Sequence, residues 1–474
     1  MKFETVIGLE VHVELATASK MFCGCSTSSG AAANSQVCPI CLGMPGVLPV
    51  VNQEAVQLAL KTAVAFHCQI AAVCRFARKS YFYPDLPKNY QISQYEEPLA
   101  TGGWLEISGQ RIRIRRIHLE EDAGKLIHPE QDQTYSLIDF NRTGIPLMEI
   151  VTEPDLRSPE AAVEFLQRLR QNLRYLRVSD CSMEEGSLRC DANISVRREG
   201  QPGLGVKVEV KNLNSFKSVR KALLFEASRQ TRLLIEGKPF RQETRLWNEN
   251  LGITESMRGK EQAHDYRYFP EPDLVPLRFE AGVTASLKTE VVELPQARRE
   301  RLIKDYGLSS YEAEVLTAEK EVADYFEEAV RYYPQPRMVA NWIMGDLAGL
   351  LREKKCAINQ QPVTAEMLGE LARMVHDGKI TMTAAKDVLR ETFNTGKHPA
   401  LVVQERNLVQ IDDASAVKTV VDQVIAENPK AWADFLAGTD KAIGFLIGQV
   451  MRKTRGRANP RKVEELIRGY RHGK

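Results

Sequence analysis

The amino-acid sequence predicts an α+β fold, in which a sheet-based domain is followed by all-helical regions. Residues 4–15 alternate between apolar and polar side chains with a period of two, which is typical of a strand with one buried face. From about Leu294 onward the apolar residues recur at helical spacing instead. Because 474 residues are too many for one ordinary core, we expect roughly two to four domains.

The composition is that of a soluble globular protein, with 43% hydrophobic and 27% charged residues. The net charge of +2 says little about binding partners. No apolar run reaches the roughly 18 residues that a membrane span needs. Glu4 and Glu10 interrupt the first apolar stretch, which argues against a signal peptide. We therefore expect a cytoplasmic protein that does not enter a membrane.

The first predicted strand, residues 4–15, has an unusual polar face. Glu10, His12 and Glu14 share that face, because side chains two residues apart on a strand point the same way. A row of two carboxylates around an imidazole suits contact with water, a cation or a substrate. The period alone is equally compatible with an ordinary half-solvated strand.

Four of the nine cysteines are clustered. Cys23 and Cys25 form one close pair, Cys38 and Cys41 form another, and the polar residues between the pairs could not build an apolar core. This layout predicts a structural zinc knuckle at 23–41, with free or redox thiols as the alternative. Four thiolates would leave no open position on the metal for catalysis. The ligand pattern of zinc deaminases is absent.

Residues 78–94 are dense in Tyr, Lys and Asn, and a similar mixture recurs at 265–273. Pro84 and Pro87 make the first segment a loop or a sheet edge rather than a helix. Aromatic rings with nearby cations suit stacking on a nucleobase and contact with phosphate. They suit an ordinary packed loop equally well.

Two further strand-like segments carry carboxylates, namely 112–122, which ends in three acids, and 145–155, where Glu149 lies on the face opposite Met148 and Ile150. Oxygen ligands that converge from several strands suit Mg²⁺ in sites that also hold phosphates. The sequence has no P-loop motif, so any ATP site is of another type. The pattern alone indicates a possible metal site on a sheet.

The C-terminal part of the chain is predicted to be helical. Helices are expected at 295–306, 321–331, from 341 onward, 364–376, 381–391, 416–427, 430–437, 440–453 and 460–471. Residues 450–474 contain nine Lys or Arg against two Glu. Such a concentration of basic residues is typical of phosphate-backbone binding, although a solvated basic face is the simpler alternative.

The motifs together resemble the B subunits of bacterial and organellar tRNA-dependent amidotransferases along the whole chain. The stretches that carry the resemblance are 6–14, 81–94, 118–125, 139–155, 183–193 and 209–216. It implies an N-terminal mixed-sheet cradle domain at 1–293 with an ATP and metal site, a helical domain at 294–404, and a small helical tail domain at 405–474 that binds tRNA. The archaeal-type paralogue carries an inserted domain, for which the continuous motif order leaves no room.

The resemblance also implies a reaction. ATP phosphorylates the side-chain carboxylate of Glu on tRNA(Gln) or Asp on tRNA(Asn), and ammonia then displaces phosphate to leave the amide. A partner amidase A subunit supplies the ammonia from glutamine through a channel, and a small C subunit completes a heterotrimer. A non-catalytic tRNA-binding adaptor in the same complex is the alternative function.

The site residues follow from the same resemblance. His12, Glu121 and Glu149 are expected to hold Mg²⁺ for catalysis, with Glu10 close by. Contacts to ATP or to the tRNA acceptor end are expected from Lys79, Tyr81, Tyr83, Lys88, Asn89, Ser187, Arg189, Asn193 and Lys211. Some family members carry the four-cysteine knuckle and others lack it, so it is not expected to be essential to the chemistry.

Overall fold

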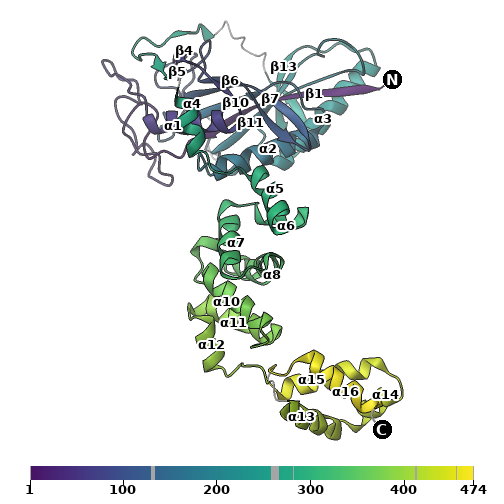
Figure 1. The fold of residues 1–474 in the computed structure, drawn as a ribbon. Coiled ribbons are helices and arrows are strands. Elements are labelled where there is room, and N and C mark those ends of the chain that lie inside the picture. The colour runs from purple at the N-terminus through teal and green to yellow at the C-terminus, as the bar shows by residue number, and fades with distance from the viewer. Residues whose placement is uncertain are drawn as a thin grey trace. The chain divides into compact units, whose positions relative to one another are not determined.

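The computed structural model of the protein describes residues 2–129, 134–257, 266–280, 282–411, 414–454 and 456–472. It divides into two compact units, Met1–Leu294 and Pro295–Lys474. The first unit combines a large sheet with helices, and the second is helical (Figure 1). The predicted α+β class is therefore confirmed.

A nine-stranded sheet organises the first unit. In spatial order its strands are β14 (Ile253–Ser256), β13 (Glu243–Asn248), β12 (Val208–Lys211), β11 (Leu188–Arg198), β1 (Phe3–Glu14), β10 (Pro146–Thr152), β7 (Gln110–Glu121), β6 (Ala100–Ile107) and β2 (Gln69–Ile70). Neighbouring strands are antiparallel except β12 and β13, which are parallel. The sheet is thus mixed, and β1 lies at its centre.

The alternation along β1 gives the sheet one apolar and one polar face. Leu9, Val11 and Val13 are fully buried in a core shared with three helices. These are α1 (Gln53–Ala65), α2 (Pro159–Tyr175) and α3 (Phe216–Ile235), which cover the apolar face. Figure 1 shows α2 and α3 lying side by side against the sheet. The polar side chains of β1 therefore point to the opposite face.

Local sequence fixes where these helices begin. Asn52, Ser158 and Ser215 precede α1, α2 and α3, and each accepts a hydrogen bond from a backbone N–H of the first turn. Pro159 follows its cap at the first helical position, where a missing N–H costs nothing.

Smaller strands complete the unit. They are β3 (Val73–Cys74) with β16 (Leu277–Arg278), β8 (Lys125–Ile127) with β9 (Leu137–Asp139), and β4 (Ala77–Ser80) between β5 (Tyr90–Ser93) and β15 (Phe269–Pro270). The last of these sheets joins the two aromatic segments that the sequence singled out, except for residue 265, which lies outside the described part of the chain. Helix α4 spans Val283–Glu290.

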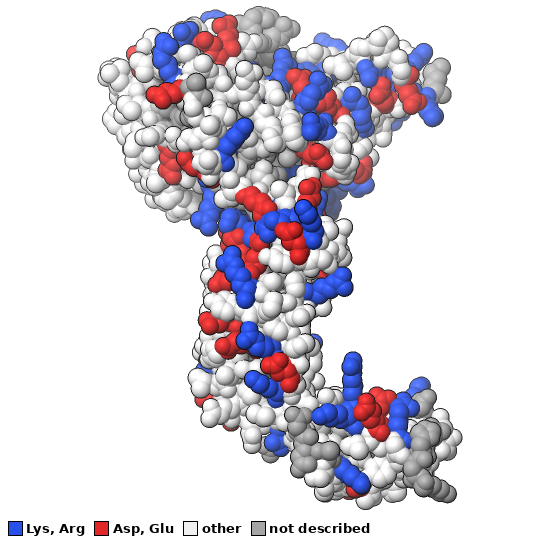
Figure 2. Space-filling view, viewed as in Figure 1, with Lys and Arg blue, Asp and Glu red and all other residues white. Residues whose placement is uncertain are grey.

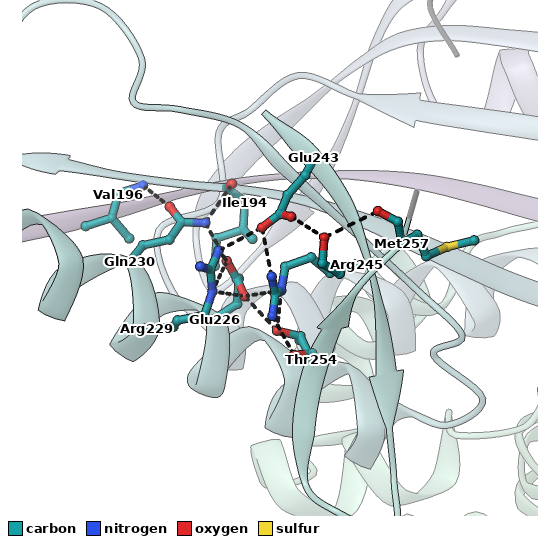
Figure 3. A network of polar contacts seen from close by, with 10 residues as sticks. Ile194, Val196, Glu226, Arg229, Gln230, Glu243, Arg245, Thr254 and Met257 are labelled. Carbon is teal, nitrogen blue, oxygen red and sulfur yellow. Dashed lines mark hydrogen bonds and ion pairs between the residues drawn. The ribbon is translucent and has the colours of Figure 1, made fainter. Parts of the chain in front are cut away.

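A buried polar network attaches the far edge of the large sheet to α3 (Figure 3). Glu226 is fully buried and accepts hydrogen bonds from Arg229, Gln230 and Thr254. Arg245 of β13 lies 3.6 Å from the same carboxylate. Because a buried charge must be paired, these contacts hold β13 and β14 in one position on the helix.

The second unit contains two groups of helices, each with its own apolar core. The first group is α5 (Pro295–Tyr306), α6 (Ser310–Leu316), α7 (Lys320–Tyr332), α8 (Pro336–Trp342), α9 (Ala348–Lys354), α10 (Ala365–His376), α11 (Met382–Thr395) and α12 (Pro399–Glu405). The second group is α13 (Ala414–Glu427), α14 (Pro429–Leu436), α15 (Asp440–Lys453) and α16 (Pro460–His472). In the part of the chain that the structure describes, no helix is both long and apolar enough to cross a membrane.

Candidate active site

Three central strands bring an imidazole and two carboxylates together on the polar face. His12 of β1 lies opposite Glu149 of β10, and Glu149 lies opposite His118 of β7. Two residues further along β7, Glu120 projects from the same face. One ligand atom each from His12, Glu120 and Glu149 lies within 4.8 Å of the others. We call these three residues the acidic triad.

His118 was not singled out in the sequence, yet it binds the triad. Its Nε2 lies 2.7 Å from a carboxylate oxygen of Glu149 and 3.7 Å from one of Glu120. His12 Nε2 lies 3.4 Å from the other oxygen of Glu120. The hydroxyl of Ser93 donates a further hydrogen bond to Glu120, at 3.1 Å. The triad is therefore held by neighbours on two sides.

Mutual charge sets the protonation of this cluster. Burial alone would lower the pKa of His12, but the hydrogen bond to Glu120 and the charge of Glu149 raise it to about 9. Burial would likewise raise the pKa of Glu149, whereas the charge and hydrogen bond of His118 lower it to about 2. The carboxylates thus stay ionised although they are buried, as a cation site requires.

Glu121, which the sequence placed with His12 and Glu149, lies elsewhere. Its carboxylate pairs with Lys88 and accepts the backbone N–H of Ile92 at 2.9 Å. Because side chains alternate along β7, Glu120 and Glu121 point to opposite faces of the sheet. The carboxylate that lies with His12 and Glu149 is therefore that of Glu120, not that of the predicted Glu121. The sequence could have distinguished Glu120 from Glu121. Ile117 and Leu119 are apolar, so the even-numbered residues of this stretch lie on the polar face.

Other predicted residues extend the polar face across β1, β11 and β12. Asn193 donates to Glu10 at 2.8 Å. Lys211 lies 2.5 Å from Asp191 and 3.5 Å from Glu209. The row thus combines a carboxylate held by an amide with a lysine paired to two carboxylates.

Two predicted residues at the start of β11 contact other partners. Arg189 lies opposite His12 and donates to the buried carboxylate of Asp122 at 2.7 Å. Ser187 instead donates to Asp180, at 2.5 Å. Arg189 therefore adjoins the acidic triad, whereas Ser187 serves a local turn.

An aromatic wall, which we define as Tyr81, Tyr266 and Tyr268, stands beside the triad. The ring centroids of Tyr81 and Tyr266 are 5.9 Å apart, and those of Tyr266 and Tyr268 are 6.0 Å apart. Burial, together with the charges of Glu120 and Glu149, raises the pKa of Tyr268. Lys79 Nζ lies 5.0 Å from the Tyr266 ring centroid.

A buried ion pair holds this wall in place. Arg78 of β4 donates two hydrogen bonds to Glu271, at 2.7 and 2.9 Å, and the Glu271 side chain is fully buried. The guanidinium also lies over the rings of Tyr90 and Phe269. Bidentate pairs of this kind fix orientation as well as distance. They anchor the strand that follows Tyr268.

The remaining predicted contacts lie in the loop between β4 and β5. Lys88 and Glu121 line a pocket on the apolar side of the sheet, next to Cys23 and Cys41. Tyr83 is 55% exposed, and Asn89 adopts a left-handed conformation at the end of a turn. Lys79 thus lies against the rings of Tyr81 and Tyr266, whereas Lys88 pairs with Glu121 away from the triad.

The four clustered cysteines converge as their spacing suggested. One sulfur from each of Cys23, Cys25, Cys38 and Cys41 lies within 4.8 Å of the others. A hydrogen bond from the Cys23 thiol lowers the pKa of Cys41 to about 5. Burial raises the pKa of Cys25 to about 11. Four close sulfurs in this arrangement match the donor set of a tetrahedral zinc ion.

The cysteine loop is tied to the segment that leads into β10. Asn34 donates to the backbone of Ile138 and accepts from that of Phe140, at 3.0 and 2.8 Å. Asn141 accepts from the backbone N–H of Gln36 at 2.8 Å. The loop therefore supports the strand that carries Glu149.

The last helices carry exposed basic side chains. Arg452 on α15 and Arg461 on α16 are exposed, and Figure 2 shows basic groups that protrude from this part of the surface. Residues 455, 473 and 474 of the basic stretch lie outside the described part of the chain. An exposed set of cations is compatible with a polyanionic partner.

The comparisons with known proteins cover almost the entire chain. Residues 5–285 match the family described as GatB/GatE catalytic domain, and residues 324–470 match the GatB domain. The chain is 53% identical over 473 residues to the B subunit of the aspartyl/glutamyl-tRNA(Asn/Gln) amidotransferase of Moorella thermoacetica, with 99% of each protein covered. It is 52% identical to the corresponding protein of Carboxydothermus hydrogenoformans, with 98% of each covered. The chain therefore belongs to the family of B subunits of the aspartyl/glutamyl-tRNA(Asn/Gln) amidotransferases.

Proposed function

We propose that this subunit performs the phosphoryl-transfer step of tRNA amidation on the polar face of its large sheet. In that step ATP phosphorylates the side-chain carboxylate of Glu-tRNA(Gln) or Asp-tRNA(Asn), and ammonia then displaces phosphate. The observation that supports this proposal is the convergence of His12, Glu120 and Glu149 from three strands. Buried, ionised carboxylates around an imidazole favour a site for a cation and phosphate over a surface that only binds tRNA.

The acidic triad fits a Mg²⁺ ion in its donor set. His12, Glu120 and Glu149 would hold the ion, with Glu120 in the place first given to Glu121. When bound, the metal would neutralise phosphate oxygens and orient the transferred group. His118 keeps the carboxylates in place. Arg189 and Lys211 add fixed positive charge to the same face, and Asn193 holds Glu10 there.

The aromatic wall fits the planar part of a nucleoside. Tyr81, Tyr266 and Tyr268 present rings next to the triad, and Lys79 adds a cation for phosphate. The nucleoside is that of ATP or that of the 3′ end of the tRNA. Tyr266 and Tyr268 belong to this proposed contact in addition to the residues expected from the sequence.

Zinc, the partners and the tRNA complete the proposal. Cys23, Cys25, Cys38 and Cys41 would hold a structural zinc ion that organises their loop. An amidase A subunit would supply ammonia, and a small C subunit would complete the heterotrimer in the cytoplasm. The basic residues of α15 and α16, within 405–474, would contact the phosphate backbone of the misacylated tRNA.

A substitution and its matched control test the assignment of the metal ligand. In the complex with the A and C subunits and Glu-tRNA(Gln), Glu120→Gln is expected to abolish the phosphorylated intermediate, while tRNA binding survives. Glu160→Gln, at a surface ion pair with Arg220, serves as the matched control and should behave as wild type. Transfer of radiolabel from the γ-phosphate of ATP measures the step.

The possible results separate the alternatives. Full transfer by Glu120→Gln would reject this ligand. If Glu121→Gln blocks transfer and Glu120→Gln does not, Glu121 is the metal ligand, as the sequence predicted. If substitution of the triad residues leaves both ATP hydrolysis and tRNA amidation by the complex unchanged, the adaptor function is supported instead.

A further inference from the structure

Lys20 is a completely buried lysine beside the cysteine cluster. Its relative exposure is 0%, and it lies in the segment between β1 and α1. Its ammonium donates three hydrogen bonds, to the carbonyl of Gln36 at 2.8 Å, the carbonyl of Phe140 at 3.4 Å and the sulfur of Cys41 at 3.8 Å. All three donors of the ammonium are thereby used.

The counter-charge of this ammonium is not a carboxylate. Among the residues that the structure describes, no Asp or Glu oxygen lies within ion-pair distance of Lys20 Nζ. Lysine is almost never fully buried without a partner, because an isolated ammonium in an apolar interior costs many kilocalories per mole. Two carbonyl dipoles reduce this cost but supply no net negative charge. The negative charge that balances the Lys20 ammonium must therefore come from the cysteine sulfurs.

The state of the four cysteines decides whether such an anion exists. Four protonated thiols are neutral, and two disulfides are neutral as well. Four thiolates around a divalent cation leave an excess of two negative charges. A metal-free cluster with Cys41 alone ionised carries one negative charge, so the metal-bound state places the most negative charge beside the buried ammonium that contacts Cys41.

We propose that Lys20 is the built-in counter-ion of a zinc–tetrathiolate cluster formed by Cys23, Cys25, Cys38 and Cys41. This inference rests on the zinc site proposed above and adds a residue outside the ligand set. Through its bond to the Phe140 carbonyl, Lys20 also connects the cluster to the segment that precedes β10. Lys20 is thus a positioning residue that acts through the metal ligands.

Zinc affinity tests the proposal directly. The full-length chain is titrated with zinc against a chromophoric chelator, as wild type, Lys20→Met and Lys20→Gln. Loss of a group that contacts a metal ligand typically weakens binding by about 10- to 100-fold, and we expect a loss in this range. Lys61→Met, on α1 of the same unit, is the matched control and should leave zinc affinity unchanged.

Thermal unfolding with and without zinc gives a second readout that is independent of activity. With zinc bound, wild type should melt at a higher temperature than Lys20→Met. After removal of zinc the difference in melting temperature should shrink, because the buried ammonium then faces at most the single thiolate of Cys41. A merely structural role of the lysine side chain would lower the melting temperature by the same amount in both states.

The results separate two failures. If wild type binds no zinc, the zinc site itself is rejected. If wild type binds zinc but Lys20→Met and Lys20→Gln bind it within about threefold as well, the counter-ion role is rejected and the zinc site stands. If Lys20→Met does not fold, the zinc affinity of Lys20→Gln alone tests the counter-ion role. In wild type loaded with Co²⁺, the thiolate charge-transfer band should lie at shorter wavelength than in Lys20→Gln.

Discussion

At the scale of single residues, the His12 imidazole is the group for which a proton and the proposed metal ion would compete. The neighbouring carboxylates raise its pKa from 6.5 to about 9, so in the metal-free protein its charged form stabilises the fold fully below pH 6.5. That stabilisation is lost as the pH rises through 9. His12→Gln is therefore expected to destabilise the metal-free protein by on the order of 3 kcal/mol near pH 6 and by little above pH 9.

Urea unfolding of the metal-free protein at several pH values checks this expectation. His128→Gln, at an exposed histidine of the same unit, provides the control and should show no such trend. A destabilisation by His12→Gln that is equal at both ends of the pH range would contradict the ion pairing described for His12 and Glu120.

The same residues show how much of the candidate site can be predicted from the sequence. The alternation of β1 was enough to place Glu10 and His12 on one face, and a short strand pattern placed Glu149 opposite its apolar neighbours. The choice between Glu120 and Glu121 depended on the phase of β7, which Ile117 and Leu119 define. His118 could not be recognised, because a lone histidine in a strand has no role until its cross-strand neighbours are known.

At the scale of elements, the wall that contains Tyr268 joins two segments far apart in the chain. Tyr268→Ala is expected to raise the KM for the substrate whose nucleoside stacks there, ATP or aminoacyl-tRNA, by about tenfold, because one stacked base is worth roughly 1–3 kcal/mol. Tyr268→Phe keeps the ring and should change this KM little. Steady-state kinetics with each substrate varied in turn identify the nucleoside.

The exposed Tyr311 of α6 offers a matched control, and Tyr311→Ala should leave both KM values unchanged. If Tyr268→Ala folds and shifts neither KM, the wall does not bind a nucleoside. A fall in kcat with unchanged KM values would instead point to a role in the chemical step.

Elements differ in how well the sequence predicts them. Long helices such as α5, α7 and α10 have enough turns for their apolar period to be read, and they begin and end close to the predicted residues. Short elements such as α6 and α12 have too few turns for a period and were not predicted. The pairing of β15 with β4, and the network of Figure 3, depend on contacts between distant residues that no local pattern encodes.

At the scale of the whole molecule, the chain separates the proposed chemistry from the proposed capture of tRNA. Deletion of 405–474 is expected to weaken tRNA binding while ATP hydrolysis in the remaining complex is largely retained. The double change Arg452→Gln and Arg461→Gln should lower the slope of log K against log salt concentration by about one per lost phosphate contact. Equal tRNA affinity of the truncated and complete complexes would refute this role.

The central place of β1 has a consequence for synthesis on the ribosome. This strand is made before its two neighbours, Pro146–Thr152 and Leu188–Arg198, which emerge far later. Until then the nascent chain exposes the apolar residues Leu9, Val11 and Val13, all fully buried in the finished protein. Unpaired apolar strands are prone to aggregate. We therefore expect the emerging strand β1 to need a chaperone, and slower translation before residue 198 to lower the yield of folded protein.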